Sequence, residues 1–378
     1  MVDTQFQAPR QRVQRTRLQE WWRLFRKNRL AFAGLFIFIL FLLFALAGLV
    51  LTSGSDPILD PSMVRLQEKL RPPLSIPDLE TLRPEEIPRL GIFLFGTDNL
   101  GRDVFARMLQ GAWVSLTVGF VAVGISVIVG IFMGGLSGYF GQSRVRVDQL
   151  LIAGLLVIGM ALLSGAARMV GMSLISAGVL LLAFNFLTRK SKSFRGRFLS
   201  AGTFTVDTLI MRFVDIMLCF PSFFLILTVV ALLPASIYNI MIVIGLTSWM
   251  GATRFVRAEF LSLREQDFVT AARAMGLGNM RIIFRHMIPN AIAPVLVSAT
   301  IGIASAILTE AGLSFLGFGV PPPHATWGNI LSDGKRFIFD APWLTFVPGI
   351  AILIVVLSFN LFGEGLRDIF NPKLRERY

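Results

Sequence analysis

The stretch AFAGLFIFILFLLFALAGLVL, residues 31–51, decides the fold of this chain. Its 21 residues include no charge. At about 1.5 Å per residue, a helix of this length crosses the ~30 Å hydrocarbon layer of a bilayer. Lipid admits only helices and closed barrels, and barrel strands would alternate apolar with polar residues. The sequence therefore predicts an all-α integral membrane protein.

The composition agrees with this prediction. The chain has 378 residues, of which 54% are hydrophobic and 16% charged, and a net charge of +13. In a membrane protein, Lys and Arg accumulate on cytoplasmic loops, so this excess indicates orientation and we expect no nucleic-acid partner. The single cysteine, Cys219, excludes an internal disulfide, and His286 and His324 lack metal-ligand spacing, so we expect no metal site.

Polar segments surround the first span on both sides. Residues 1–30 contain eight basic residues and two acidic ones, so we expect a cytoplasmic N-terminal segment. Its tryptophans and arginines fit either a helix lying in the membrane interface or a simple anchor for the span at 31–51. The acidic, proline-rich residues 52–111 should lie on the far side, and the charges near 98–107 suggest a structured cap.

Seven further apolar runs follow. They cover residues 114–138, 149–166, 170–187, 207–233, 237–252, 291–311 and 344–363. Eight crossings would put both termini, including the tail 364–378, on the basic cytoplasmic side. The runs between 145 and 203 read as an inserted hairpin, with a re-entrant pair as the alternative.

Asp207, Arg212, Asp215 and Glu310 are ionisable residues in or near these spans. Arg212 and Asp215 are three residues apart and share a helix face. Because charges inside a span need a partner or a wet cavity, they either line an interior path or pair with each other at the cytoplasmic end. Glu310, late in its span, is a candidate for the path or for a contact with a partner subunit.

The polar stretch 253–290 predicts two short helices joined at a bend. Residues 266–274 read as one helix, and Gly276 stands where a left-handed residue ends a helix. We expect Asn279 to cap a second helix and Pro289 to close it. With Ala271 and Ala272 on its surface, the first helix would let another protein approach the backbone closely.

This stretch resembles the cytoplasmic loop of the integral membrane subunits of bacterial ATP-binding-cassette (ABC) importers. That loop reads Glu-Ala-Ala, three residues, Gly, nine residues, Ile, one residue, Leu-Pro. The chain matches it at Ala271, Ala272, Gly276 and Pro289, with Ile288 for the leucine. It departs from it at Thr270 and His286, which stand in place of the glutamate and the isoleucine.

Further stretches are similar to one group of these importers, the C-type permeases for dipeptides, oligopeptides and nickel. They are FGTDNLGRDVFARMLQGAWVSL (95–116), FVTAARAMGLGNMRIIFRHMIPN (268–290), ILTEAGLSFLGFGVPPPHATWGNIL (307–331) and FNLFGEGLRDIFNPKL (359–374). The likeness runs in collinear order along nearly the whole chain. The exception is 145–203, where members of the group have almost no intervening residues.

The resemblance implies a type I ABC importer transmembrane domain over 112–363, with six core helices and the inserted hairpin. It implies an inner-membrane permease subunit of a peptide importer, coupled to ATPases through the loop 266–289. The implied coupling residues are Ala271, Ala272, Arg273, Gly276, Ile288 and Pro289. The implied partners are a homologous B-type permease, one or two ATPases, an extracytoplasmic solute-binding protein and membrane lipid.

The chain itself should be non-catalytic and bind no cofactor. It lacks the GxxxxGK[ST] loop that cradles nucleotide phosphates, so ATP and Mg²⁺ would bind to the partner ATPases. Three alternatives stay open. They are a nickel-chelate importer of the same group, an ion-coupled secondary carrier using Asp207, Asp215 and Glu310, and a membrane scaffold that only recruits a partner.

Overall fold

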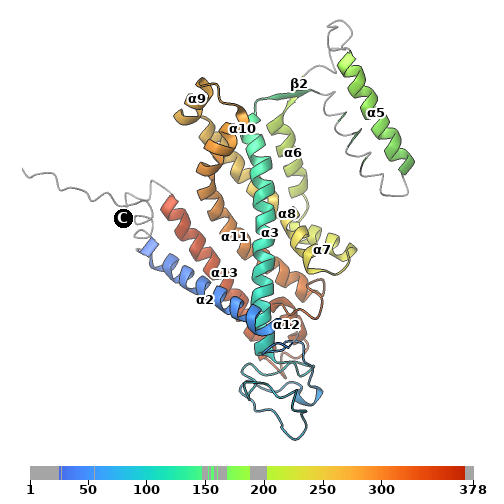
Figure 1. The fold of residues 1–378 in the computed structure, drawn as a ribbon, viewed down its shortest axis with the longest axis vertical. Coiled ribbons are helices and arrows are strands. Elements are labelled where there is room, and N and C mark those ends of the chain that lie inside the picture. Colours follow the sequence, from blue (N-terminus) through green and yellow to red (C-terminus); the bar gives the residue numbers. More distant parts are fainter. Residues whose placement is uncertain are drawn as a thin grey trace, which may run out of the picture. The chain divides into compact units, whose positions relative to one another are not determined.

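The computed structural model describes residues 25–26, 28–54, 56–146, 152, 155–156, 160, 168–187 and 202–370 (Figure 1). The predicted interfacial helix before the first span and the tail after 370 lie outside these residues, as does most of the apolar run 149–166. The chain divides into two compact units. Unit 1 contains the residues up to Ile125, Phe223–Ser248 and the residues from Ala293, and unit 2 contains Ser126–Ser222 and Trp249–Ile292.

Helices make up nearly all of the regular structure. The long ones are α2 (Arg29–Thr52), α3 (Val104–Phe140), α8 (Ile237–Arg264), α11 (Ile288–Phe315) and α13 (Trp343–Phe370). The shorter ones are α5 (Arg168–Leu187), α6 (Val206–Leu218), α7 (Ser222–Leu232), α9 (Asp267–Ala274), α10 (Asn279–Arg281) and α12 (Trp327–Gly334). A 3₁₀ turn (Leu66–Glu68), a π-helical turn (Ile282–Met287) and two short strands complete the set.

The number of spans is confirmed only in part. Within the described residues, five helical segments are long and apolar enough to cross a membrane, and α6 with α7 would make six if this broken pair is one span. The predicted total of about eight is not confirmed, because only Met172–Ala183 of α5 enters the same test, as a shorter apolar helix, and most of 149–166 is not described.

Several predicted boundaries were wrong. The run 207–233 is not one helix but breaks between Leu218 and Ser222, where Pro221 lacks the N–H that a continuous helix needs. Helix α3 begins ten residues before 114, and α8 continues to Arg264, so 253–264 is helix and not loop. An apolar run marks only the part of a helix that lies in the lipid. The backbone hydrogen bonds of the helix continue beyond the bilayer, so the helix is longer than the run.

In unit 1, α2 packs along α13, and the two are seen side by side in Figure 1. Aromatic rings fill the contact, since the ring of Phe38 lies 5.0 Å from that of Phe359 and is stacked with that of Phe362 at 5.9 Å. At one end the contact becomes polar, because Asn28 Nδ2 donates to the carboxylate of Asp368 at 3.0 Å. The first and last described helices thus support each other.

The residues between α2 and α3, which we call the cap (53–103), are held by a buried ion-pair network. Asp98 is fully buried and accepts from Arg102 Nε at 2.7 Å. Its carboxylate also pairs with Arg107 of α3, and Asp333 of α12 accepts from Arg107 at 2.9 Å. Two carboxylates and two guanidinium groups therefore neutralise each other and tie the cap to two helices of unit 1.

In unit 2, a line of glycines on α3 allows α8 to approach closely. A Cβ on Gly130 would lie 2.5 Å from Ala252 Cβ, and one on Gly134 would lie 2.6 Å from the carbonyl oxygen of Thr253. Gly138 meets Phe260 in the same way, at 2.5 Å. Glycines four residues apart lie on one helix face, and in lipid such faces bring helix backbones together.

The insert is joined to unit 2 through a short ribbon. Strand β1 (Arg144–Arg146) pairs antiparallel with β2 (Gly202–Thr205), and the amide of Val206 donates to the carbonyl oxygen of Ser143 at 3.1 Å. Paired backbones of this kind lie about 5 Å apart. The two ends of the insert therefore meet at one place.

Removing the insert should leave the rest of unit 2 folded. We expect a chain in which an Asn-Gly turn replaces residues 147–201 to accumulate in the membrane and to unfold thermally near the temperature of the intact chain, because β1 and β2 already hold the flanking residues together. Thermal unfolding of the purified protein measures this. Loss of the shortened chain from the membrane would show that the insert stabilises the core.

Candidate functional site

Helix α9 and the bend after it form as the sequence predicts. Gln266 is the N-cap, Asp267 lies in the first turn and Arg273 in the last, so both charges favour the helix dipole. Gly276 has φ +74°, and its amide donates to Arg273 O at 2.9 Å while that of Leu277 donates to Ala272 O at 3.2 Å. These are the two bonds of a Schellman motif, which needs a left-handed residue at this place.

The helix folds back on the segment that follows it. Val269 and Ala272 of α9 are buried, and the π-helical turn that α9 contacts buries Ile282, Ile283 and Met287. Ala272 is only 1% exposed, so the prediction that it lies on the surface was wrong. Its small side chain allows the two segments to pack closely, whereas Ala271 is exposed.

The second helix predicted in the loop, from Asn279 to Pro289, begins and ends differently in the structure. Asn279 is not an N-cap, since Gly278 takes that position. Pro289 does not close the helix either, because it stands in the first turn of α11. The π-helical turn before it changes the hydrogen-bond pattern, and the amide of Ile288 bonds five residues back to Ile283 O. Proline is tolerated in a first turn, so the chain continues as a helix into the membrane span.

A tyrosine at the end of α3 anchors the loop 266–289. The hydroxyl of Tyr139 donates to Asn279 Oδ1 at 2.8 Å, and the guanidinium carbon of Arg273 lies 5.2 Å from the centre of its ring. The phenol thus contacts both arms of the bend. Sequence reasoning missed Tyr139, because no local pattern marks a contact between residues 140 positions apart.

The outer surface of the loop combines small and apolar groups with charged ones. Ala271, Arg273, Gly276 and Pro289 are exposed, and Ile288 is half-buried. The exposed large apolar side chains are Phe268, Met275, Met280 and Phe284, with exposed fractions of 36, 72, 62 and 64%. An apolar patch of this kind beside charged residues is typical of a protein-binding surface.

The predicted pair of Arg212 and Asp215 exists but is loose. The two side chains are 3.8 Å apart and largely exposed, whereas Arg254 of α8 donates to Asp215 at 2.7 Å. Nearby, Asp207 is held by Arg257 Nη2 at 2.6 Å and by the hydroxyl of Ser137. Both aspartates therefore have arginine partners on α8, which the sequence alone did not identify.

Glu310 lies apart from this group, inside unit 1. Its side chain is fully buried and accepts from Ser314 Oγ at 2.6 Å and from Ser115 Oγ at 3.3 Å. Ser314 also lies 3.4 Å from the hydroxyl of Thr326, the N-cap of α12. The carboxyl group connects α3, α11 and the start of α12 within this unit, and a role in the path stays a prediction.

Comparisons with known proteins show the family of the chain. Residues 198–376 match the model of the binding-protein-dependent transport system inner membrane component, and residues 16–73 match that of the N-terminal TM domain of oligopeptide transport permease C. Over 371 residues the chain is 35% identical to a dipeptide transport system permease protein of Alkalihalophilus pseudofirmus, covering 97% of this chain and 95% of that one.

The chain belongs to this family of ABC transport permeases. It is also 30% identical to an oligopeptide transport system permease protein of Bacillus subtilis, over 93% of this chain and 88% of that one. A similar match, at 32%, covers 96% of this chain and 97% of a dipeptide permease of Haemophilus influenzae. Among solved structures, the MetNI methionine ABC transporter aligns with 69% of this permease at 15% identity, covering 95% of that chain, with a TM-score of 0.43.

Substitutions at Glu310 should separate a structural role from a path role. We expect Glu310→Gln to fold normally and to transport, because the amide keeps an acceptor for Ser314 and carries no charge. Glu310→Leu should lose about 1–3 kcal/mol of stability, since it leaves buried hydroxyl groups without that acceptor. Thermal unfolding and uptake by the assembled transporter measure both effects. A stable Glu310→Gln protein without transport would instead indicate a role in the path.

Proposed function

We propose that this chain is the membrane-spanning, non-catalytic permease subunit of an ATP-driven peptide importer, and that the loop 266–289 couples it to the ATPases. The observation that carries the coupling proposal is the bend itself. A Schellman turn at Gly276 fixes two packed arms, Tyr139 anchors them to α3, and the outward surface presents small and apolar groups beside exposed arginines. A rigid projection of this kind suits a cleft on another protein.

The lengths of the helices support a position of the loop outside the lipid. Helix α3 and the helical run Asn279–Phe315 have 37 residues each. Each is about 55 Å long at 1.5 Å per residue, well above the ~30 Å hydrocarbon layer. Residues 253–290 carry six arginines, which favours the cytoplasmic side.

The proposed mechanism needs two states of the assembly. Closing of the ATPases around ATP would move the loops, and α3 would carry that movement into the membrane part, which alternates between inward and outward access. The path would form with a homologous B-type permease, and an extracytoplasmic solute-binding protein would deliver the solute. ATP and Mg²⁺ would bind only to the ATPases, and both termini would be cytoplasmic.

Peptides are the solutes that the names of the relatives favour. The A. pseudofirmus and B. subtilis relatives are named as dipeptide and oligopeptide permeases, and a relative from Pseudomonas aeruginosa, 33% identical over 95% of this chain, as a di/tripeptide permease. An ion-coupled carrier is less well supported, because such a carrier needs carboxylates that exchange protons. Two of the three candidate carboxylates, Asp207 and Asp215, are instead each held by an arginine, and the third, Glu310, accepts from hydroxyl groups.

Two glycines of the loop provide a matched test of coupling. A Cβ would meet no atom within 4 Å at either Gly276 or Gly278, but Gly276 has φ +74° whereas Gly278 has φ −65°. Alanine should therefore cost roughly 1–2 kcal/mol in backbone strain at Gly276 and little at Gly278. We expect Gly276→Ala to reduce solute-stimulated ATP hydrolysis and uptake by roughly 5–30-fold, and Gly278→Ala to preserve both.

The measurement uses the assembled transporter in vesicles without an ion gradient. Normal transport by the Gly276→Ala protein would contradict the role of the bend, as would equal loss in the Gly278→Ala protein. Uptake that needs a gradient but no ATP would favour the carrier. Assembly with ATPases without any uptake would favour the scaffold.

A further inference from the structure

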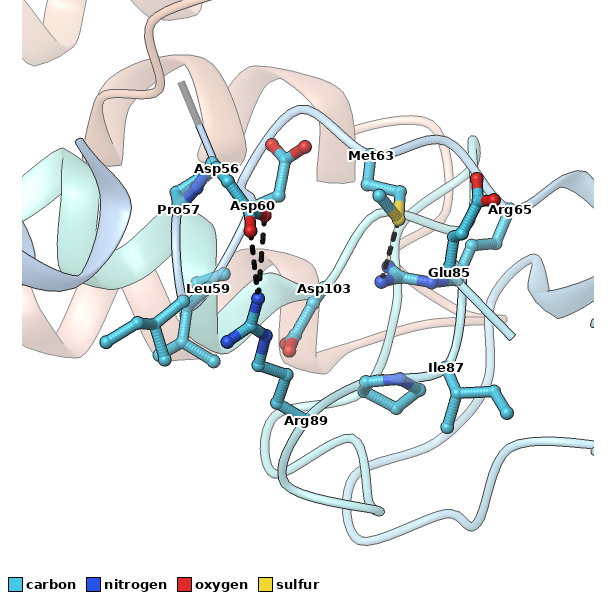
Figure 2. A pocket seen from close by; sticks show the side chains of 13 residues that line it. Asp56, Pro57, Leu59, Asp60, Met63, Arg65, Glu85, Ile87, Arg89 and Asp103 are labelled. Carbon is cyan, nitrogen blue, oxygen red and sulfur yellow. Dashed lines mark hydrogen bonds and ion pairs between the residues drawn. The ribbon is translucent and has the colours of Figure 1, made fainter. Parts of the chain in front are cut away.

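The cap contains a polar cavity of about 240 Å³ that no part of the proposed mechanism uses. Three stretches of unit 1 line it, namely residues 56–65, residues 85–89 and the first turn of α3 with Asp103 before it. Figure 2 shows the guanidinium group of Arg65 and the carboxyl group of Asp103 reaching into the same space. The volume lies below the ~300–1,000 Å³ typical of pockets for drug-sized ligands, so it suits a smaller molecule.

Arg65 is buried in the wall of this cavity with incomplete hydrogen bonding. The residue is only 5% exposed, its Nε donates to the carbonyl oxygen of Glu86, and its Nη2 lies 3.4 Å from Met63 Sδ. Its Nη1 is buried and has no hydrogen-bond partner within the described residues. The guanidinium group also lies over the ring of Phe93, at 5.9 Å. The group is thus held in place while one of its donors has no acceptor.

An unpaired donor on a buried guanidinium group is costly, and the cost disappears if a ligand supplies the acceptor. The backbone keeps Arg65 in position, because its amide donates to Leu100 O at 3.0 Å. A Cβ on Gly101 would lie 1.8 Å from the carbonyl oxygen of Arg65, so only glycine fits against it. The backbone position of Arg65 is therefore built into the cap.

The other charges around the cavity are mostly negative. Asp60, Glu85 and Asp103 line the cavity together with Arg65, while Asp56 and Arg89 pair with each other at 3.4 Å in an exposed position. Asp103 is 4% exposed, and its burial raises the pKa of its carboxyl group. A positive charge brought close to Asp103 would stabilise its ionised form.

These charges define the chemistry of an occupant. A simple anion would meet three carboxylates, and a simple cation would leave Nη1 of Arg65 without an acceptor. The described residues also contain no group of three or more His, Cys, Asp or Glu side chains that could hold a metal ion. A molecule with an ammonium group at one end and a carboxylate at the other can pair with the carboxylates of the cavity and with Arg65 at the same time.

We infer that the cap cavity is a binding site for a small zwitterion, an amino acid or a dipeptide. Its carboxylate lies against the guanidinium group of Arg65, and its ammonium group lies against Asp60 and Asp103. Neither ATP nor the loop 266–289 enters this inference, so it stands or falls separately from the proposed function.

The test uses the full chain in lipid nanodiscs, titrated with L-alanyl-L-alanine in a calorimeter. We expect saturable binding, weakened about tenfold or more by Arg65→Met and by Asp103→Asn, because each removes a charged partner. Asp103 accepts from the amide of Phe105 at 2.9 Å, and the side-chain oxygen in Asp103→Asn can keep this bond. The Asp103→Asn variant therefore decides the question if Arg65→Met fails to fold. Arg83→Met is the matched control, since Arg83 belongs to the cap but its side chain is 81% exposed and does not line the cavity.

Peptides blocked at both ends show whether the zwitterion matters. N-acetyl-L-alanyl-L-alanine amide should not compete with the free dipeptide. Equal binding of the blocked peptide, absence of dipeptide binding, or binding that both substitutions leave unchanged would each overturn the inference. Tighter binding of a blocked peptide with a lysine side chain would also overturn it, because the cavity would then receive a basic side chain of a partner protein.

Discussion

The contact of Tyr139 with Asn279 and Arg273 is the interaction on which the account of this permease depends. It joins the two arms of the loop 266–289 to the end of α3. Helix α3 in turn packs on α8 through Gly134 and Gly138 at distances that allow no larger side chain. Within unit 2, loop, α3 and α8 are therefore linked by close contacts, and a force on the loop would reach the membrane helices through them.

The cost of charges near lipid explains much of the remaining polar structure. Asp207 and Asp215 each have an arginine on α8, and Asp98 and Asp333 share Arg102 and Arg107. Glu310 has hydroxyl groups in place of an arginine. Such pairs contribute less to stability than their number suggests, because desolvation offsets the attraction. Their effect is to fix which helices meet. Arg65 is the exception, since one of its buried donors has no partner among the described residues.

The sequence predicted the local features well. The first span, α9 from 266 to 274 and the left-handed Gly276 all follow from hydropathy, helix propensity and cap chemistry, which act within a few residues. The features that the sequence did not predict depend on tertiary contacts. Asn279 was assigned as a cap because asparagine favours that place, but its side chain bonds Tyr139, 140 residues away. The burial of Ala272 depends on the π-helical turn, which no simple periodicity reveals.

Breaks and extensions of the helices were harder to predict. Pro221 interrupts an apolar run and Pro289 does not interrupt a polar one, because the effect of proline depends on its position in the helix. The glycines at 130, 134 and 138 were a readable signal for helix packing that was not used. The total number of spans depends on residues between 147 and 167, of which the structure describes only 152, 155–156 and 160.

Cross-linking from the exposed face of α9 is the most direct test of the central claim that the loop 266–289 binds the ATPases. In a chain whose exposed cysteine is replaced by Cys219→Ser, a cysteine is placed at Ala271 on the loop or, as a control, at the exposed Ser62 of the cap. The account predicts that the Ala271→Cys chain captures a co-expressed ATPase and that the Ser62→Cys chain does not. Failure of both to capture it, or labelling of the Ala271→Cys chain by a membrane-impermeant reagent added outside the cell, would contradict the account.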